Sequence, residues 1–167
     1  IEELYRAVIM DHAKNPKNKG LTHGEGYQFV HFKNPSCGDD INVEVKIEDG
    51  VIKDIHQDGR GCSISMSSAS VMSDTLKGLK VDEALEVIND FYELLKGEDP
   101  KHEEELGEAV AYSGVSQFPA RIKCATLAWK AIEQAIKEAN TGSHVFLKGT
   151  ISILDAIEDV DIFINKD

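Results

Sequence analysis

Residues 41–58, "INVEVKIEDGVIKDIHQD", carry the pattern that decides the fold. Every second residue from Ile41 to Ile47 is apolar, and the alternation ends at Asp49-Gly50, a dipeptide typical of a tight hairpin turn. Successive side chains of a strand point to opposite faces, so this stretch predicts two antiparallel strands that share one apolar face. Such a face requires helices to cover it.

The segments on either side supply a third strand and the helices. The stretch "YQFVHFKN", residues 27–34, precedes the hairpin and completes a three-stranded antiparallel meander. Helical spacing of apolar residues predicts four helices, over residues 2–14, 63–78, 81–97 and 118–140. Asp82 is the candidate N-cap of the third helix, and Pro119 lies in the first turn of the fourth. The fold class expected is α+β, with the sheet covered on one face by helices.

Two further segments have a different composition. Residues 98–117, between the last two helices, form a polar segment with the acidic run Glu103-Glu104-Glu105, which is interpreted as a solvated face. Residues 140–167 are β-branched and acidic, and they follow a complete helix. The predicted organisation is therefore one domain over residues 1–139 and a C-terminal extension of unknown role over residues 140–167. A β-rich extension, a strand added to a sheet edge and a cloning-derived appendage are all open interpretations of that extension.

Charge and hydropathy narrow the classes of partner. The 167 residues carry a formal net charge of −12, without a Lys/Arg block, so neither nucleic acid nor an anionic membrane is an expected partner. No apolar run approaches the roughly 20 residues that span a bilayer. The N-terminal segment resembles an amphipathic helix rather than a signal peptide. We therefore expect a cytoplasmic protein.

The three cysteines lie at predicted element boundaries. Cys37 precedes a strand, Cys62 precedes a helix, and Cys124 lies in the first turns of the last helix. Backbone amides at a helix N-terminus stabilise a thiolate, which is the form that binds metal or acts as a nucleophile. These positions favour a shared site over three unrelated core thiols.

Three thiolates would need a fourth ligand, because zinc sites are normally tetrahedral. The six histidines show no paired ligand spacing and are interpreted as surface or ordinary polar residues. Asp39 is two residues from Cys37 and would share its face in an extended segment, whereas Asp40 would point away. Asp39 is therefore the better candidate ligand.

Three motifs together resemble a known family. The stretches "NPSCGDD", "GRGCSISMSSAS" and "FPARIKCATLAWKAIE" are similar to the cysteine motifs of the U-type (IscU/SufU, NifU N-terminal-like) iron–sulfur cluster assembly family, over about residues 3–139. The IscU branch has a histidine immediately before the third cysteine, where this chain has Lys123. The SufU branch has an added segment between the second and third motifs, which residues 96–117 match. Both features favour the SufU branch.

The resemblance implies a function and assigns the site. It implies zinc held by Cys37, Asp39, Cys62 and Cys124, and a sulfurtransferase-like acceptor that takes persulfide sulfur from a SufS-type cysteine desulfurase for the downstream iron–sulfur assembly machinery. Cys37, on a loop, is the expected catalytic sulfur acceptor, in preference to Cys124, which lies on a helix and is less mobile. Arg121 would either orient Asp39 and balance the anionic site or be a solvated residue at the helix start. The alternatives are an IscU-like scaffold for cluster assembly and a purely structural zinc domain.

Overall fold

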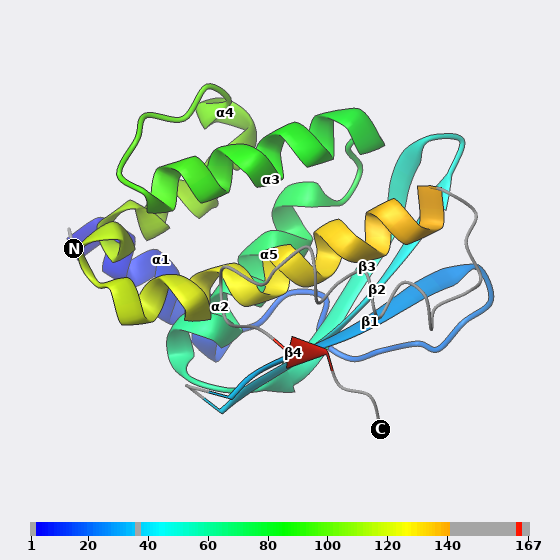
Figure 1. The fold of residues 1–167 in the computed structure, drawn as a ribbon, viewed down its shortest axis with the longest axis horizontal. Helices are drawn as coiled ribbons and strands as arrows, with labels where there is room; N and C mark the ends of the chain where they lie inside the picture. Colours follow the sequence, from blue (N-terminus) through cyan, green and yellow to red (C-terminus); the bar gives the residue numbers. More distant parts are fainter. Residues whose placement is uncertain (1–2, 36–37, 141–162, 165–167) are drawn as a thin grey trace.

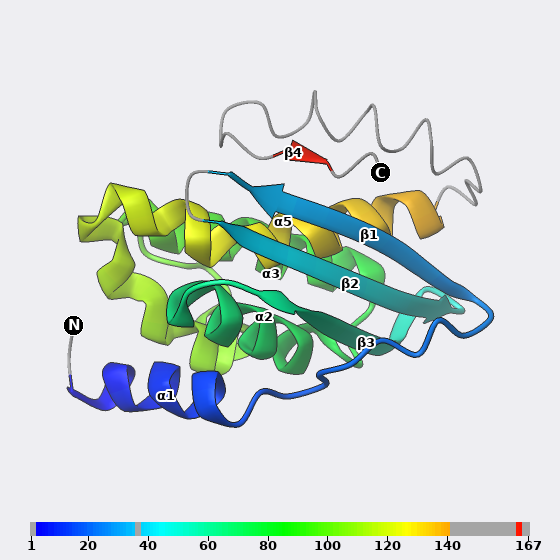
Figure 2. The same ribbon diagram turned by 90° about the horizontal axis from the view of Figure 1, so that it is seen from below.

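The sheet lies on one side of the molecule and the helices on the other (Figures 1 and 2). The computed structural model describes residues 3–35, 38–140 and 163–164. The elements along the chain are α1 (Glu3–Lys14), β1 (Tyr27–Asn34), β2 (Asp39–Glu48), β3 (Val51–Arg60), α2 (Ser63–Leu76), α3 (Val81–Leu95), α4 (Glu103–Leu106), the 3-10 helix η1 (Gly107–Gln117), α5 (Pro119–Asn140) and β4 (Phe163–Ile164). This is an α+β fold, as predicted.

Strand β2 is the centre of the predicted meander. It pairs antiparallel with β1 on one side and with β3 on the other, and the sheet order is β3-β2-β1-β4. The turn between β2 and β3 is formed by Asp49 and Gly50, both with positive φ (54° and 73°), the conformation that this turn dipeptide favours. The two-residue strand β4 pairs antiparallel with the end of β1.

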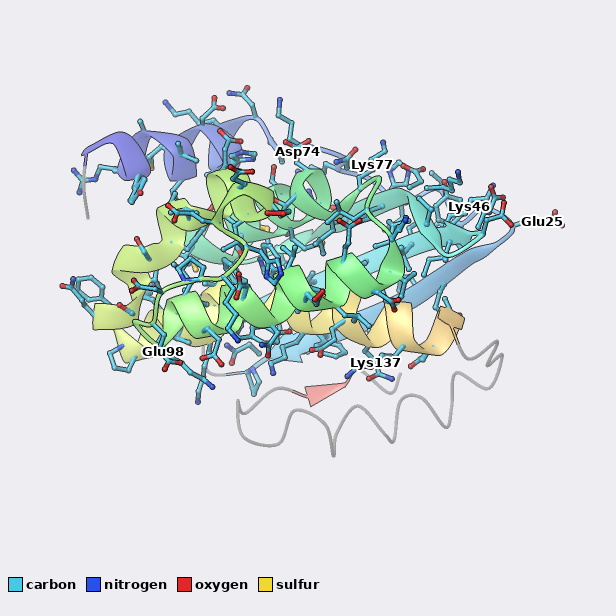
Figure 3. The ribbon with its side chains drawn as sticks, turned by 90° about the horizontal axis from the view of Figure 1, so that it is seen from above. Glu25, Lys46, Asp74, Lys77, Glu98 and Lys137 are labelled. Atoms are coloured by element: carbon cyan, nitrogen blue, oxygen red, sulfur yellow. The ribbon has the colours of Figure 1, made fainter. Side chains whose placement is uncertain are left out.

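The alternation in β2 sorts its side chains between two faces. Ile41, Val43 and Val45 are fully buried and belong to the core with Phe32 of β1 and Ile55 of β3. Helices α5 and α2 contact this face of the sheet, and α1 lies against α2. Charged side chains project outward around these layers (Figure 3). The helices therefore pack against the apolar face that the sequence predicts.

The centre of the helical layer is aromatic. Trp129 of α5 is fully buried, and its ring stacks on Phe91 of α3 with the centroids 4.0 Å apart and the planes 10° apart. Tyr112 of η1 meets Phe91 edge-on at 6.0 Å. This cluster joins α3, η1 and α5 into one core.

One local expectation differs from the structure, and one segment has a role that the sequence did not indicate. Helix α3 begins at Val81 with Lys80 as its N-cap, so the prediction of Asp82 as the cap is wrong. Asp82 instead lies in the first turn, where a carboxylate is stabilised by the helix dipole. The polar segment 98–117 also contributes to the core, because α4 and η1 bury Leu106 and Tyr112.

Two remaining predictions concern the chain ends and the membrane. Residues 141–162 and 165–167 lie outside the described residues, so the domain boundary at residue 139 stays a prediction. Within the part of the chain that the structure describes, none of the helices has the length and hydropathy needed to cross a membrane.

Candidate metal centre

Three separate elements bring metal-ligating side chains to one point. Asp39 is the first residue of β2, on the core-facing side of the sheet, and is fully buried. Cys62 is the N-cap of α2, directly after β3, and is partly exposed. Cys124 lies in the second turn of α5 and is fully buried. One carboxylate oxygen and the two sulfurs all lie within 4.8 Å of one another.

The two carboxylate oxygens of Asp39 differ in their hydrogen bonding. Its Oδ1 accepts a hydrogen bond from the backbone N–H of Cys62 at 3.1 Å. Its Oδ2 is buried and has no hydrogen-bond partner among the described residues. Because a buried carboxylate oxygen without a partner is costly, this atom indicates a position meant for a cation. Two thiolates and a carboxylate suit zinc, which binds both ligand types.

Gly61 permits the close approach of this carboxylate to helix α2. A Cβ at this position would lie 2.3 Å from Asp39 Oδ1 and 2.6 Å from Ser65 Oγ, far inside van der Waals contact. The glycine before Cys62 is therefore required by space.

The surroundings of Cys62 favour its thiolate. A hydrogen bond from the Cys124 thiol is the largest cause, and together with hydrogen bonds from Ser65 it lowers the pKa of Cys62 from 9.0 to about 5, against the opposing effects of burial and of the Asp39 charge. The Ser65 Oγ lies 3.6 Å from Cys62 Sγ and also donates to the Cys62 carbonyl at 3.0 Å. A thiolate at neutral pH is ready to bind metal without first losing a proton.

Asp40, next to Asp39, lies on the opposite face of the sheet. It hydrogen-bonds to Nε2 of His31, which belongs to the neighbouring strand β1. Two adjacent carboxylates therefore have separate environments, one beside the thiols and one beside an imidazole. The structure places Asp40 away from the thiols, where the strand period predicted it.

The predicted fourth ligand, Cys37, lies outside the described residues. The flanking residues come close together, since Gly38 N–H donates to the Asn34 carbonyl at 2.9 Å. Asn34 is in turn paired with Asp39 across the β1–β2 ladder. The sequence places Cys37 within this short connection, and its role as a ligand stays a prediction.

A hollow of about 490 Å³ opens beside Cys62. Its lining residues are Cys62, Ser63, Ile64, Val115, Phe118 and Arg121. Phe118 is half exposed, and Arg121 is exposed on the first turn of α5. None of the described contacts joins Arg121 to Asp39. Arg121 lines the hollow. This hollow gives an approach from solvent to the Cys62 end of the site.

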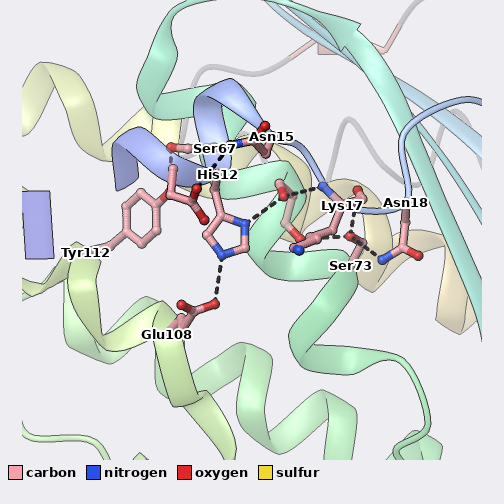
Figure 4. A network of polar contacts seen from close by, with 10 residues as sticks. His12, Asn15, Lys17, Asn18, Ser67, Ser73, Glu108 and Tyr112 are labelled. Carbon is pink, nitrogen blue, oxygen red and sulfur yellow. Dashed lines mark hydrogen bonds and ion pairs between the residues drawn. The ribbon is translucent and has the colours of Figure 1, made fainter. Parts of the chain in front are cut away.

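Sequence reasoning missed two polar residues that the structure makes important. Ser65, next to the Cys62 thiol, follows the cysteine by three residues, a spacing that could have indicated a contact within the first helical turn. His12 was interpreted as a surface or ordinary polar residue, but it is only 1% exposed and contacts Ser70 and Glu108 (Figure 4). No local sequence signal places His12 in the interior, because its partners are 58 and 96 residues away.

Known proteins resemble this chain over most of its length. The family model described as the NifU-like N terminal domain matches residues 4–125, which is most of the chain and includes all three cysteines. The chain belongs to the NifU-like N-terminal domain family. The U-type resemblance predicted from the three motifs is thereby confirmed.

Other members of the NifU-like N-terminal domain family are close in sequence. The chain is 43% identical over 143 residues to the zinc-dependent sulfurtransferase SufU of Bacillus subtilis (strain 168), covering 86% of this chain and 96% of that protein. It is 41% identical over 145 residues to the iron–sulfur cluster assembly scaffold protein IscU of Streptococcus pyogenes serotype M1, covering 87% and 90%.

A solved structure shares the fold. It is described as an iron–sulfur cluster assembly scaffold protein for the SUF system from Fervidobacterium islandicum AW-1, and it matches with a TM-score of 0.69 at 30% identity. The match covers 81% of this chain and 96% of that one.

Proposed function

We propose that this protein is a zinc-dependent sulfurtransferase of the SufU type, which acts in the cytoplasm on persulfide sulfur destined for iron–sulfur clusters. The observation that carries the proposal is the convergence of Asp39, Cys62 and Cys124 within 4.8 Å, with Asp39 Oδ2 buried and without a partner among the described residues. The name of the Bacillus relative supports the zinc and the activity.

Four residues would hold the zinc. They are Cys37, Asp39, Cys62 and Cys124, and a bound zinc ion would keep the coordinating thiols deprotonated at neutral pH. The hydrogen bonds of Asp39 and Ser65 already hold Cys62 at the end of α2. The Asp39 carboxylate is a hard oxygen donor, whereas the three thiolates are soft sulfur donors.

Cys37 would accept the sulfur. Its thiolate attacks the outer sulfur of a persulfide on a SufS-type cysteine desulfurase, so that a new S–S bond forms at Cys37 Sγ. The bond between that outer sulfur and the donor cysteine breaks, and the donor leaves as a thiolate while the proton stays with the transferred sulfur. The neighbouring residues Pro35 and Gly38 lie in a turn between β1 and β2, and both are exposed, which suits a residue that must meet a partner.

The hollow beside Cys62 would admit the donor segment of the partner. Its walls are largely apolar, from Ile64, Val115 and Phe118, and Arg121 adds a cation at the rim. Such a lining suits a short peptide segment that carries a persulfide. The sulfur would pass from there to the downstream iron–sulfur assembly machinery.

A scaffold function is the second candidate, favoured by the IscU name of the Streptococcus relative. The residue before the third cysteine distinguishes the two, because the IscU branch has histidine there and this chain has Lys123. Zinc and a cluster would compete for the same cysteines, so the metal content of the purified protein separates the hypotheses.

The test measures sulfide release by a SufS-type cysteine desulfurase with and without this protein, with zinc determined on the same sample. We expect about one zinc per chain and a clear stimulation of release, which Cys37→Ala abolishes while the protein stays folded. A labile iron–sulfur cluster with little zinc would instead indicate a scaffold. Bound zinc without stimulation would indicate a structural zinc domain.

A further inference from the structure

The two described thiols of the candidate metal centre belong to different helices. Cys62 belongs to the N-terminus of α2, and Cys124 belongs to α5. The separation of the two sulfurs therefore depends on how α2 is placed along α5. A shift of a few tenths of an ångström between the helices would spoil ligand distances, which zinc tolerates only narrowly.

Ser68 links α2 to α5 beside this site. Its hydroxyl donates to the carbonyl oxygen of Ala125 at 2.6 Å, and Ala125 directly follows Cys124. The same hydroxyl accepts a hydrogen bond from the indole N–H of Trp129 at 3.0 Å. Ser68 and Trp129 are both fully buried, so water does not compete for these bonds. One side chain of α2 thus contacts two positions, one turn apart, on α5.

We propose that Ser68 is a positioning residue for the metal centre, acting through Ala125 and Trp129 to fix Cys124 opposite Cys62. This inference rests on the proposed function, because it assumes that zinc binds at these thiols. The Trp129 ring is held on its other side by Phe91, so the link is anchored in the aromatic core. The described hydrogen bonds of the Ser68 hydroxyl go to Ala125 and Trp129, so its proposed effect is on where the ligands lie.

Trp129 is also the only tryptophan of the chain, which makes the link observable. A change in the distance between α2 and α5 alters the hydrogen bond of its indole and its stacking on Phe91. Zinc added to the metal-free protein should therefore change the fluorescence of Trp129. The readout reports the placement of the helices and does not depend on sulfur transfer.

The experiment compares Ser68→Ala with Ser70→Ala. Ser70 is an equally buried serine of the same helix, and its hydroxyl also takes part in two hydrogen bonds, with His12 and the Lys17 backbone N–H, but on the α1 side of α2. Zinc affinity is measured for each full-length protein by competition with a chelating dye. We expect Ser68→Ala to bind zinc roughly tenfold more weakly and to lose most of the zinc-dependent fluorescence change. Ser70→Ala should stay within about twofold of the wild type.

Three results would overturn the inference. Equal zinc affinity in both variants, with tight binding by the wild type, would show that Ser68 does not position the ligands. If Ser68→Ala does not fold, Trp129→Phe removes the indole donor and keeps an aromatic ring, and unchanged affinity in that variant would contradict the proposal. A wild type that binds no zinc at all would refute the proposed function itself, and this inference with it.

Discussion

Helix α2 contributes to two polar clusters of opposite character, each built around a buried side chain. The His12 cluster consists of His12, Ser70, Glu108 and Lys17, and each ring nitrogen of His12 has a partner at 2.7 or 2.8 Å (Figure 4). The thiol cluster consists of Asp39, Cys62 and Cys124, and one buried oxygen in it has no partner among the described residues. A cluster whose polar atoms are satisfied holds helices together. A cluster with a ligand atom that lacks a partner can bind a metal ion.

The strongest test of this contrast removes the unused ligand atom. We expect Asp39→Ala to weaken zinc binding by about a hundredfold, because a share of roughly 10–16 kcal/mol of metal-binding free energy is lost with one ligand of four. Asp40→Ala is the matched control, since Asp40 is adjacent but lies on the opposite face with His31. Zinc per chain is measured after dialysis against a weak chelator. Equal zinc retention in the two variants would contradict the assignment of Asp39.

The His12 cluster should respond to mutation in stability and not in metal binding. His12→Ala leaves the buried Ser70 hydroxyl with one partner fewer and opens space between α1 and α2. We expect the free energy of unfolding to fall by about 2–3 kcal/mol in urea titrations. The contact with Glu108 contributes little to this value, because the Glu108 side chain is 55% exposed.

The zinc affinity of folded His12→Ala protein should equal that of the wild type. A large loss of zinc from the folded variant would mean that the two clusters are coupled through α2, and that the distinction between them does not hold.

Two nearby glycines allow a sharper version of the same comparison. Gly61→Ala places a Cβ 2.3 Å from Asp39 Oδ1 and should displace the carboxylate, weakening zinc binding by roughly tenfold. Gly59→Ala places a Cβ 2.0 Å from the Asp40 carbonyl oxygen, at a φ of +143°, and should lower stability through the β2–β3 ladder. Zinc competition and urea denaturation on both variants separate the effects. Gly61→Ala with wild-type zinc affinity would show that the carboxylate is free to move.

The remaining prediction is a pH dependence in the metal-free protein. The pKa of Cys62 is about 5 in the folded state, against 9.0 ordinarily, chiefly because of the hydrogen bond from Cys124. The unfolded chain therefore binds more protons between these two values. The stability that Cys62 contributes is complete above about pH 9 and is lost as the pH falls to about 5.

The check is a series of urea unfolding curves across that pH window. Wild-type metal-free protein should lose stability toward low pH more steeply than Cys62→Ser, which has no thiol to titrate. Parallel pH profiles for the two proteins would argue against a thiolate at Cys62.

The sequence predicted those features that depend on short-range patterns. The alternation from Ile41 to Ile47 correctly indicated the strand, its buried face and the opposite directions of Asp39 and Asp40. The helix over residues 118–140 matches α5, with Pro119 as its first residue. The cysteine positions at element boundaries, the strand period and the family resemblance selected Cys37, Asp39, Cys62 and Cys124, and the last three meet in the structure.

The features that the sequence missed depend on contacts over long distances or on geometry at single atoms. The segment 98–117 is polar in composition, yet its Tyr112 is fully buried and packs edge-on against the Phe91 ring. The burial of His12 is set by α2 and η1, which are distant in sequence. The unused Asp39 oxygen follows from the position of the Cys62 amide, which no pattern of residue types encodes.

The central claim is that Cys37, one of the four proposed zinc ligands, accepts the sulfur, while Cys62 and Cys124 remain as ligands. Mass spectrometry of the protein after incubation with a cysteine desulfurase and cysteine tests it most directly. The account predicts one added sulfur atom on the peptide that contains Cys37, with none on the peptides of Cys62 and Cys124. Added sulfur on either of those two residues, or unmodified Cys37 in protein that has stimulated the desulfurase, would contradict it.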